Sequence, residues 1–121
     1  MGEPVSVVVG ILTFRRPEML SRLLPRVLDQ LDRLPSGTEG AILVIDNDPA
    51  ASAREATAAF GEPVRYVHEP SPGIAAARQR CLLEAMGYDL LQFIADDEEP
   101  VADWLTSMVT AWRTFARPAA V

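Results

Sequence analysis

A run of four acidic residues is the clearest candidate for chemistry in this sequence. Residues 96–99 read Asp-Asp-Glu-Glu, follow an apolar stretch at residues 90–95 and precede Pro100. Carboxylates on a tight turn can hold Mg²⁺ or Mn²⁺ through one or two oxygens, which leaves the other coordination positions to phosphate and water. The same composition also suits a solvated acidic turn that starts a helix after Pro100, and both interpretations stay open at this point.

Carboxylates or arginines also follow the other apolar stretches. Two arginines follow residues 5–13, Asp46 ends the stretch that begins at Ala41, and Arg78 follows the loop after a third stretch at residues 64–67. Arginines can bind phosphate even in an acidic protein, and carboxylates can hold the metal ion that accompanies it. The set therefore indicates a site for a phosphorylated ligand that carries a metal ion.

Asp46 and Arg78 each have an ordinary structural explanation as well. Asp46 stands before Asn47 and Pro49, which are common in turns, so a turn role is as open as a contact with a ribose or a base. Arg78 could pair with a nearby carboxylate on the surface of its helix. The sequence contains neither GxGxxG nor GxxxxGK[ST], which disfavours a dinucleotide fold and a P-loop.

Hydrophobic periodicity predicts the elements that position these residues. Continuous apolar runs predict buried strands at residues 5–13, 41–45, 64–67 and 90–95. Helical spacing predicts helices at residues 17–33, 51–60, 74–86 and 103–115, the first of them kinked or split at Pro25. This order predicts an α/β fold, a Rossmann-like parallel sheet of about four strands with helices on both faces. In such a sheet, ligands bind at the carboxyl ends of the strands.

Size, charge and cysteine content restrict the class of protein. The 121 residues are 49% hydrophobic and 23% charged, which predicts a single globular domain over residues 1–121. The net charge of −6 argues against nucleic acid as the main partner. One cysteine excludes an intrachain disulfide, and neither a signal peptide nor a long apolar run is visible. We therefore expect a cytoplasmic protein without a transmembrane segment.

Four segments, in order along the chain, resemble the family 2 glycosyltransferases, enzymes with the fold called GT-A. Residues 13–18 are similar to the family's Thr-Tyr-Asn-Arg-Pro-Glu, and residues 43–47 to its second strand ending in Val-Asp-Asn. Residues 72–79 resemble its Gly-x-x-x-Ala-Arg-Asn helix, and residues 93–105 its Asp-x-Asp motif with the helix that follows. Ala95 stands where many members have the first aspartate of Asp-x-Asp.

The resemblance implies the N-terminal, nucleotide-sugar-binding part of such an enzyme. The donor would be a nucleoside-diphosphate sugar, the cofactor Mg²⁺ or Mn²⁺, and the acceptor is not identified. The implied roles are a nucleoside pocket lined by Thr13, Phe14 and Arg15, a base contact from Asp46, Arg78 near the nucleotide, a ribose contact from Asp96 and a metal bond from Asp97, with Glu98 as a substitute ligand.

Family members continue past the length of this chain, and their later part supplies acceptor binding and the general base for inversion. No segment here matches that part, so we expect an incomplete glycosyltransferase, hexosyltransferase-like, whose general base is not in this chain. A half-sheet would leave an edge strand and an apolar helix face uncovered, which predicts a homo-oligomer.

Two alternatives remain beside this hypothesis. A non-catalytic interaction module could keep the fold without the acceptor half, and Ala95 is consistent with it. A receiver-like phosphoacceptor domain also has acids at strand ends, but such domains place an acidic pair after the first strand and a lysine after the last. Here arginines follow the first strand and the chain contains no lysine, so the receiver alternative is disfavoured.

Overall fold

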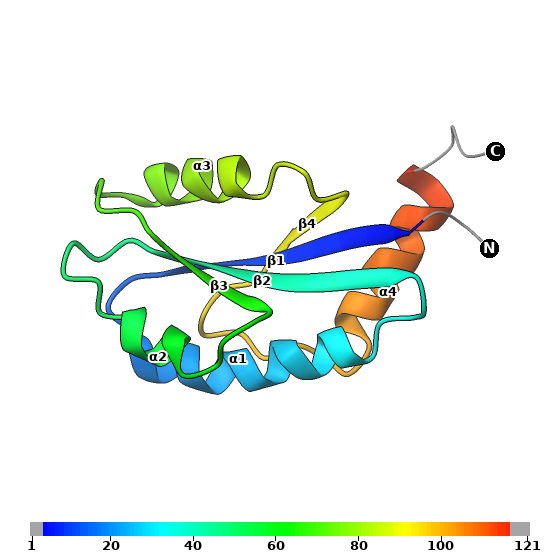
Figure 1. Ribbon diagram of the computed structural model, residues 1–121, viewed down its shortest axis with the longest axis horizontal. Coiled ribbons are helices and arrows are strands. Elements are labelled where there is room, and N and C mark those ends of the chain that lie inside the picture. Colours follow the sequence, from blue (N-terminus) through cyan, green and yellow to red (C-terminus); the bar gives the residue numbers. More distant parts are fainter. Residues whose placement is uncertain (1–3, 117–121) are drawn as a thin grey trace.

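The protein has the predicted alternation of strands and helices in a computed structural model that describes residues 4–116 (Figure 1). All strands are parallel and stand in the order β3-β2-β1-β4; they are β1 (Val5–Thr13), β2 (Thr38–Asp46), β3 (Val64–His68) and β4 (Leu90–Phe93). The helices are α1 (Pro17–Asp32), α2 (Arg54–Ala58), α3 (Ile74–Glu84) and α4 (Trp104–Ala111), followed by the π-helical turn η1 (Trp112–Ala116). The predicted α/β class and Rossmann-like sheet are confirmed.

The reversal in strand order places the helices on both faces of the sheet. The chain adds β2 and then β3 on one side of β1, and returns to place β4 on the other side. Figure 1 shows α3 alone on one face and α1 and α2 on the opposite face. Side chains of β1 alternate between the two cores: Val7 and Val9 belong to the cluster with α1 and α4, and Val8 belongs to the cluster with α3. This explains why the first strand reads as apolar without alternation.

Helix α1 runs through Pro25 without interruption, so the expected split is wrong. A proline inside a helix costs about 3 kcal/mol because it removes one backbone hydrogen bond and its ring clashes with the preceding turn. Four apolar side chains on both sides of Pro25 are buried against the sheet, namely Leu20, Leu23, Leu24 and Val27. Burial of each such side chain contributes about 1.5–3 kcal/mol, which outweighs the cost of the proline.

Several other boundaries differ from the prediction, and the starts of α2 and β2 differ by three residues each. Helix α2 begins only at Arg54, and Ala51 has a φ of 55°, which a right-handed helix does not accommodate. Strand β2 begins at Thr38, before the apolar run, because its backbone pairs with β1 from Val5 onward. The backbone pairing of β2 therefore extends beyond the apolar run from which the strand was predicted.

Helix α3 lies very close to β1 because Gly10 has no side chain. A Cβ atom at this position would lie 2.7 Å from the Sγ atom of Cys81 on α3. Burial in this contact raises the pKa of the Cys81 thiol to about 11. The close approach fixes the position of α3 over the sheet, and α3 carries Arg78.

Strands β1 and β4 are the parallel neighbours between which the strand order reverses. Their pairing covers Val7 to Gly10 of β1 and Leu90 to Phe93 of β4. Such a reversal leaves a crevice outside the carboxyl ends of the two strands, which is the usual place for a ligand in an open α/β sheet. None of the helices within residues 4–116 has both the length and the apolar character needed to cross a bilayer.

Candidate functional site

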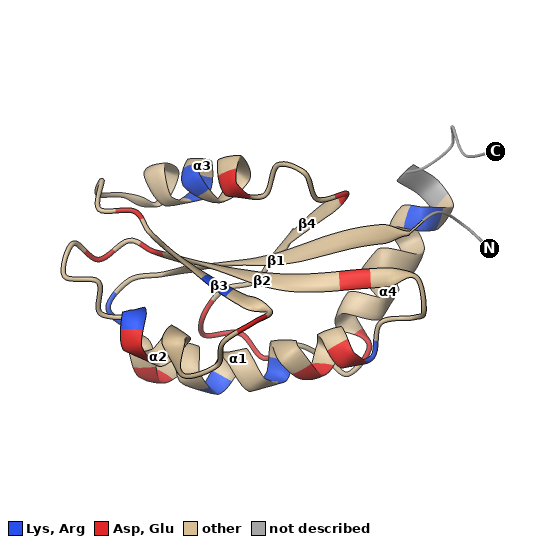
Figure 2. Cartoon of the chain, viewed as in Figure 1, with Lys and Arg blue, Asp and Glu red and all other residues tan. Residues whose placement is uncertain are grey.

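A cavity of about 830 Å³ lies at the carboxyl ends of the strands, as the strand reversal predicts. Figure 2 shows acidic segments after β2, β3 and β4 and a basic segment after β1 at this end of the sheet. The cavity is lined by residues 12–16, Asn47, Pro49, residues 72–74, Ala77, Arg78 and residues 93–97. The structure thus brings together all of the predicted site residues except Asp46 and the substitute ligand Glu98, namely Thr13, Phe14, Arg15, Arg78, Asp96 and Asp97.

Asp96 is buried at the base of the cavity and is held by two residues that follow each other closely in the chain. Thr13, the last residue of β1, donates a hydrogen bond of 3.1 Å from Oγ1 to Asp96 Oδ2. Arg16 donates from Nη1 to Asp96 Oδ1 at 3.3 Å. Each carboxylate oxygen has two acceptor sites, so Asp96 can still accept a ligand hydroxyl.

Asp97 is the exposed carboxylate of the acidic run at the cavity. Its side chain is 53% exposed, and Arg16 Nη1 lies 3.6 Å from its Oδ2 atom. Glu98 does not line the cavity, and its Oε1 atom accepts a hydrogen bond of 2.7 Å from the backbone N–H of Ala95. Glu98 therefore closes the acidic turn, whereas Asp97 faces solvent.

Within residues 4–116, no three Asp, Glu, His or Cys side chains come together as a ligand set for a metal ion. A metal at Asp97 would take its remaining ligands from water and from a bound phosphate. This is the usual arrangement for Mg²⁺, which binds through one or two carboxylates and the phosphates of the substrate. Asp97 fits that arrangement.

Arg78 lies on the first turns of α3, with its guanidinium 6.0 Å from the centre of the Phe93 ring. It forms no ion pair with any of the described residues. The nearby carboxylates are used elsewhere: Glu84 pairs with Arg65 and Arg80, and Asp89 accepts hydrogen bonds from Ser6. The charge of Arg78 is therefore available to an anion in the cavity.

The N-terminus of α3 lies at the same wall of the cavity as Arg78. Gly73 precedes the helix with a φ of 109°, a conformation that favours glycine, and no side chain caps the helix. Unpaired N–H groups and the helix dipole attract anions at such an end. Together with Arg78, this end of α3 gives one wall of the cavity the character of a phosphate site.

Arg15 and Phe14 form the rim of the cavity. The Arg15 guanidinium lies 4.8 Å from the centre of the Phe14 ring, and its Nε atom is 3.3 Å from Asp48 Oδ1. Arg15 has a φ of 56°, a conformation that is strained for a residue other than glycine, asparagine or aspartate. Strain of this kind is common in residues that surround a ligand.

Asp46 does not line the cavity, although it stands at the end of β2. It is 0% exposed, and its oxygens accept hydrogen bonds from the Asp48 and Ala53 N–H groups and from the Tyr66 hydroxyl. Burial and the neighbouring Asp46 carboxylate raise the pKa of Tyr66 to about 12. Asp46 thus stabilises the loop behind the cavity wall, and its contact with a base stays a prediction.

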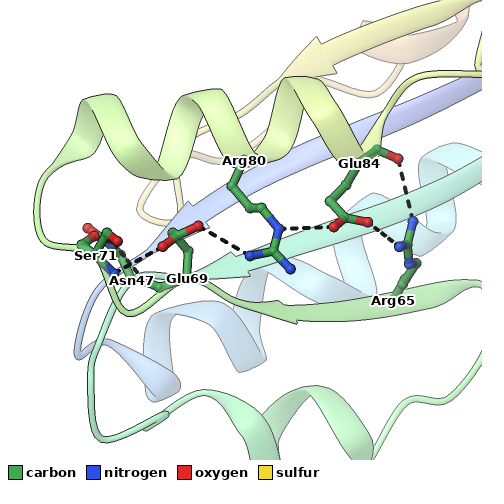
Figure 3. A network of polar contacts seen from close by, with 6 residues as sticks. All are labelled: Asn47, Arg65, Glu69, Ser71, Arg80 and Glu84. Carbon is green, nitrogen blue, oxygen red and sulfur yellow. Dashed lines mark hydrogen bonds and ion pairs between the residues drawn. The ribbon is translucent and has the colours of Figure 1, made fainter.

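Asn47 is a cavity residue whose role the sequence did not indicate. Its Nδ2 atom donates hydrogen bonds to the carbonyl oxygens of Glu69 at 2.9 Å and Ser71 at 2.8 Å. The loop after β3 is thereby attached to the end of β2 (Figure 3). Since this loop leads into Gly73 and α3, Asn47 helps to position the wall that carries Arg78.

A chain of ion pairs continues from this loop along α3 (Figure 3). Arg80 lies between Glu69, at 3.2 Å, and Glu84, at 2.9 Å, and Glu84 also pairs with Arg65. A hydrogen bond from the Ser71 N–H, followed by the Arg80 contact, lowers the pKa of Glu69. Arg80 lowers the pKa of Glu84, and both carboxylates raise the pKa of Arg80. The spacing of four residues between Arg80 and Glu84 is the one signal of this network in the sequence.

Comparison of the sequence with known proteins identifies the family of this chain. The model of the family described as Glycosyl transferase family 2 matches residues 8–117. The chain belongs to glycosyl transferase family 2. It is also similar to the succinoglycan biosynthesis protein ExoM of Rhizobium meliloti (strain 1021), with 34% identity over 117 residues. That alignment covers 93% of this chain and 37% of the relative, so the chain spans little more than a third of the relative's length. The part matched to the family contains every segment that lines the cavity.

Proposed function

We propose that this chain is the donor-binding part of an inverting glycosyltransferase that transfers a sugar from a nucleoside-diphosphate sugar to an acceptor hydroxyl. The observation that carries the proposal is one cavity with an available guanidinium, Arg78, on one wall and an exposed carboxylate, Asp97, on another. Membership of glycosyl transferase family 2 supports the same function. A cavity of about 830 Å³ has the size usual for a small-molecule ligand.

The residues around the cavity have distinct roles in this proposal. The nucleoside lies against Thr13, Phe14 and Arg15, and Asp96 accepts a hydrogen bond from a ribose hydroxyl. The diphosphate lies between Arg78, the N-terminus of α3 and Asp97. Arg78 stabilises the negative charge that develops on the diphosphate as the glycosidic bond breaks, because a positioned cation acts most strongly where charge accumulates.

Asp97 is the proposed ligand for Mg²⁺ or Mn²⁺. An exposed carboxylate beside a phosphate-binding wall is a suitable donor for either ion. A divalent cation bound there with the diphosphate supplies Lewis-acid stabilisation of the leaving group. Asp97 itself holds this charge at the edge of the cavity and so orients the diphosphate.

Inversion requires a general base on the side of the sugar opposite the leaving diphosphate. We propose that this base, and the acceptor site, belong to a further part of a longer protein. The greater length of the relative from Rhizobium meliloti supports this assignment.

We also propose that the protein is cytoplasmic and forms a homo-oligomer. The single cysteine is consistent with a reducing compartment. Large apolar side chains on α3 and just after it are exposed, with Leu83 at 57% and Met86 at 75%, and a second copy of the chain would cover them. Light scattering should give twice the mass of the monomer or more, and a clean monomer at high concentration would exclude the oligomer.

Calorimetric titration with nucleoside diphosphates, with and without Mn²⁺, tests donor binding. We expect binding that Mn²⁺ strengthens, and a rise in melting temperature, because the ligand binds the folded state alone. The matching nucleosides without phosphate serve as controls and should bind much more weakly. Equal binding of nucleoside and nucleoside diphosphate, or no binding of either, would contradict the proposal.

A further inference from the structure

Arg16 contacts both aspartates in the turn that follows β4, Asp96 and Asp97. It precedes α1 as its N-cap residue, and its Nη1 atom is 3.3 Å from Asp96 Oδ1 and 3.6 Å from Asp97 Oδ2. Its side chain is 51% exposed and lines the cavity. The two carboxylates of the candidate donor site therefore share one guanidinium, which offsets one of their two negative charges.

The two carboxylates hold Arg16 in different ways. Asp96 is buried, and Thr13 fixes its other oxygen. Asp97 is half-exposed, and Arg16 is its one ion-pair partner among residues 4–116. An exposed ion pair is weak and readily exchanged, whereas the buried pair is anchored. Arg16 can thus leave Asp97 while it stays beside Asp96.

We infer that Arg16 is a positioning residue that makes cation binding at Asp97 conditional on the nucleotide. This inference rests on the proposed function. Without nucleotide, the guanidinium occupies Asp97 and repels a second cation. A bound diphosphate offers Arg16 another anionic partner, and its movement toward the phosphates leaves Asp97 free.

The consequence is a thermodynamic coupling between the two ligands. When either ligand binds alone, its binding includes the free-energy cost of breaking the Arg16–Asp97 ion pair. When both ligands bind, this cost arises only once, so the second ligand binds without it. The presence of one ligand therefore favours the other, and the coupling acts equally in both directions. A residue that merely tied the loop after β1 to the loop after β4 would produce no such coupling.

Titration with Mn²⁺ alone, followed by water-proton relaxation, tests the inference without any nucleotide. Arg16→Gln should bind Mn²⁺ about two- to fivefold more tightly than the parent, the size expected for removal of one half-exposed ion pair. Arg16→Lys, which keeps the charge, should resemble the parent. Arg26→Gln is the matched control, because Arg26, on α1, also pairs with a carboxylate of the acidic run, Glu99, but does not line this cavity.

Calorimetry of the same variants with a nucleoside diphosphate completes the test. The factor by which Mn²⁺ strengthens nucleotide binding should be smaller in Arg16→Gln than in the parent. In the parent, the Arg16 Nε–H resonance should shift on addition of nucleoside diphosphate, and this measurement needs no variant that must fold. Mn²⁺ binding that is unchanged or weaker in Arg16→Gln, or no shift of the resonance in a parent that binds nucleotide, would overturn the inference. A parent that binds no nucleoside diphosphate would overturn the proposed function instead.

Discussion

Thr13 and Asp96 are joined by a buried hydrogen bond of 3.1 Å, although 83 residues separate them in the chain. Thr13 ends β1, and Asp96 lies in the turn after β4. The bond therefore connects the two strand ends between which the cavity lies. The shape of the candidate donor site depends on this connection as much as on the residues that would touch a ligand.

Thr13→Val should lower the free energy of unfolding by about 1–3 kcal/mol, because it leaves a buried carboxylate oxygen without its donor. Urea denaturation measures this loss. Thr13→Ser, which keeps the hydroxyl and removes a methyl group, should lose less stability than Thr13→Val. Equal stability of Thr13→Val and the parent would show that the bond does not hold the strand ends together.

Asp97→Asn should abolish the strengthening of nucleoside diphosphate binding by Mn²⁺. Without metal, the variant should bind the nucleotide at least as tightly as the parent, because a negative charge beside the diphosphate is removed. Calorimetry with and without Mn²⁺ measures both effects. Glu99→Gln, in the same acidic run but outside the cavity, should behave like the parent. A full Mn²⁺ effect in Asp97→Asn would exclude Asp97 as the metal ligand.

Arg78→Gln should weaken nucleoside diphosphate binding about 10- to 100-fold, the size expected for a charge-assisted hydrogen bond to phosphate. Its stability should change little, since Arg78 forms no ion pair within the described chain. Arg54→Gln is the matched control, because Arg54 also lies over an aromatic ring, Tyr66, but does not line the cavity. Comparable losses of affinity in both variants would argue against a phosphate contact by Arg78.

Arg80→Met should destabilise the protein at neutral pH and weaken nucleotide binding, because the loop before α3 loses an anchor. Glu69 and Glu84 have folded-state pKa values below their ordinary value of 4.5. Their contribution to stability is therefore complete above pH 4.5 and is lost as the pH falls through the folded-state values. Denaturation at several pH values should show that the difference in free energy of unfolding between parent and variant becomes smaller at acidic pH.

Arg33→Met serves as the control for Arg80→Met. It removes the exposed ion pair of Arg33, the C-cap residue of α1, with Asp29 four residues earlier, and an exposed hydrogen bond to the Ala102 carbonyl. It should lose less stability at neutral pH and leave nucleotide binding unchanged. The difference in free energy of unfolding between Arg80→Met and the parent could instead stay constant down to strongly acidic pH. That result would mean that the ion pairs of Arg80 do not cause the loss of stability.

Local pattern was sufficient for the fold because the central strands β1 and β2 are buried on both faces and read as apolar runs. The positions of the strand ends then predicted the edge of the sheet at which Thr13, Arg78 and Asp97 line one cavity. Pattern failed where tertiary packing decides, because burial on both sides of Pro25 keeps α1 continuous. The enclosure of Asp46 was likewise not visible in the sequence, and its contact with a base stays a prediction.

The support for the cavity wall was also hidden from the sequence. Asn47 donates to carbonyl oxygens 22 and 24 residues away, and Arg80 reaches Glu69 across a loop. No periodicity encodes such contacts, because they depend on how close the folded strands and loops come to one another. Most residues that line the cavity follow from strand ends, whereas the contacts that position them require coordinates.

The most direct test of donor binding at this rim is an ¹⁵N NMR titration of the whole chain with a nucleoside diphosphate and Mg²⁺. We predict that the backbone N–H signals of residues 13–16, 73–78 and 95–97 shift together and saturate at one stoichiometry. Signals at the opposite ends of the strands, such as those of Ser6 and Glu39, should stay in place. Saturable shifts confined to those opposite ends, or no shifts at all, would contradict donor binding between β1 and β4.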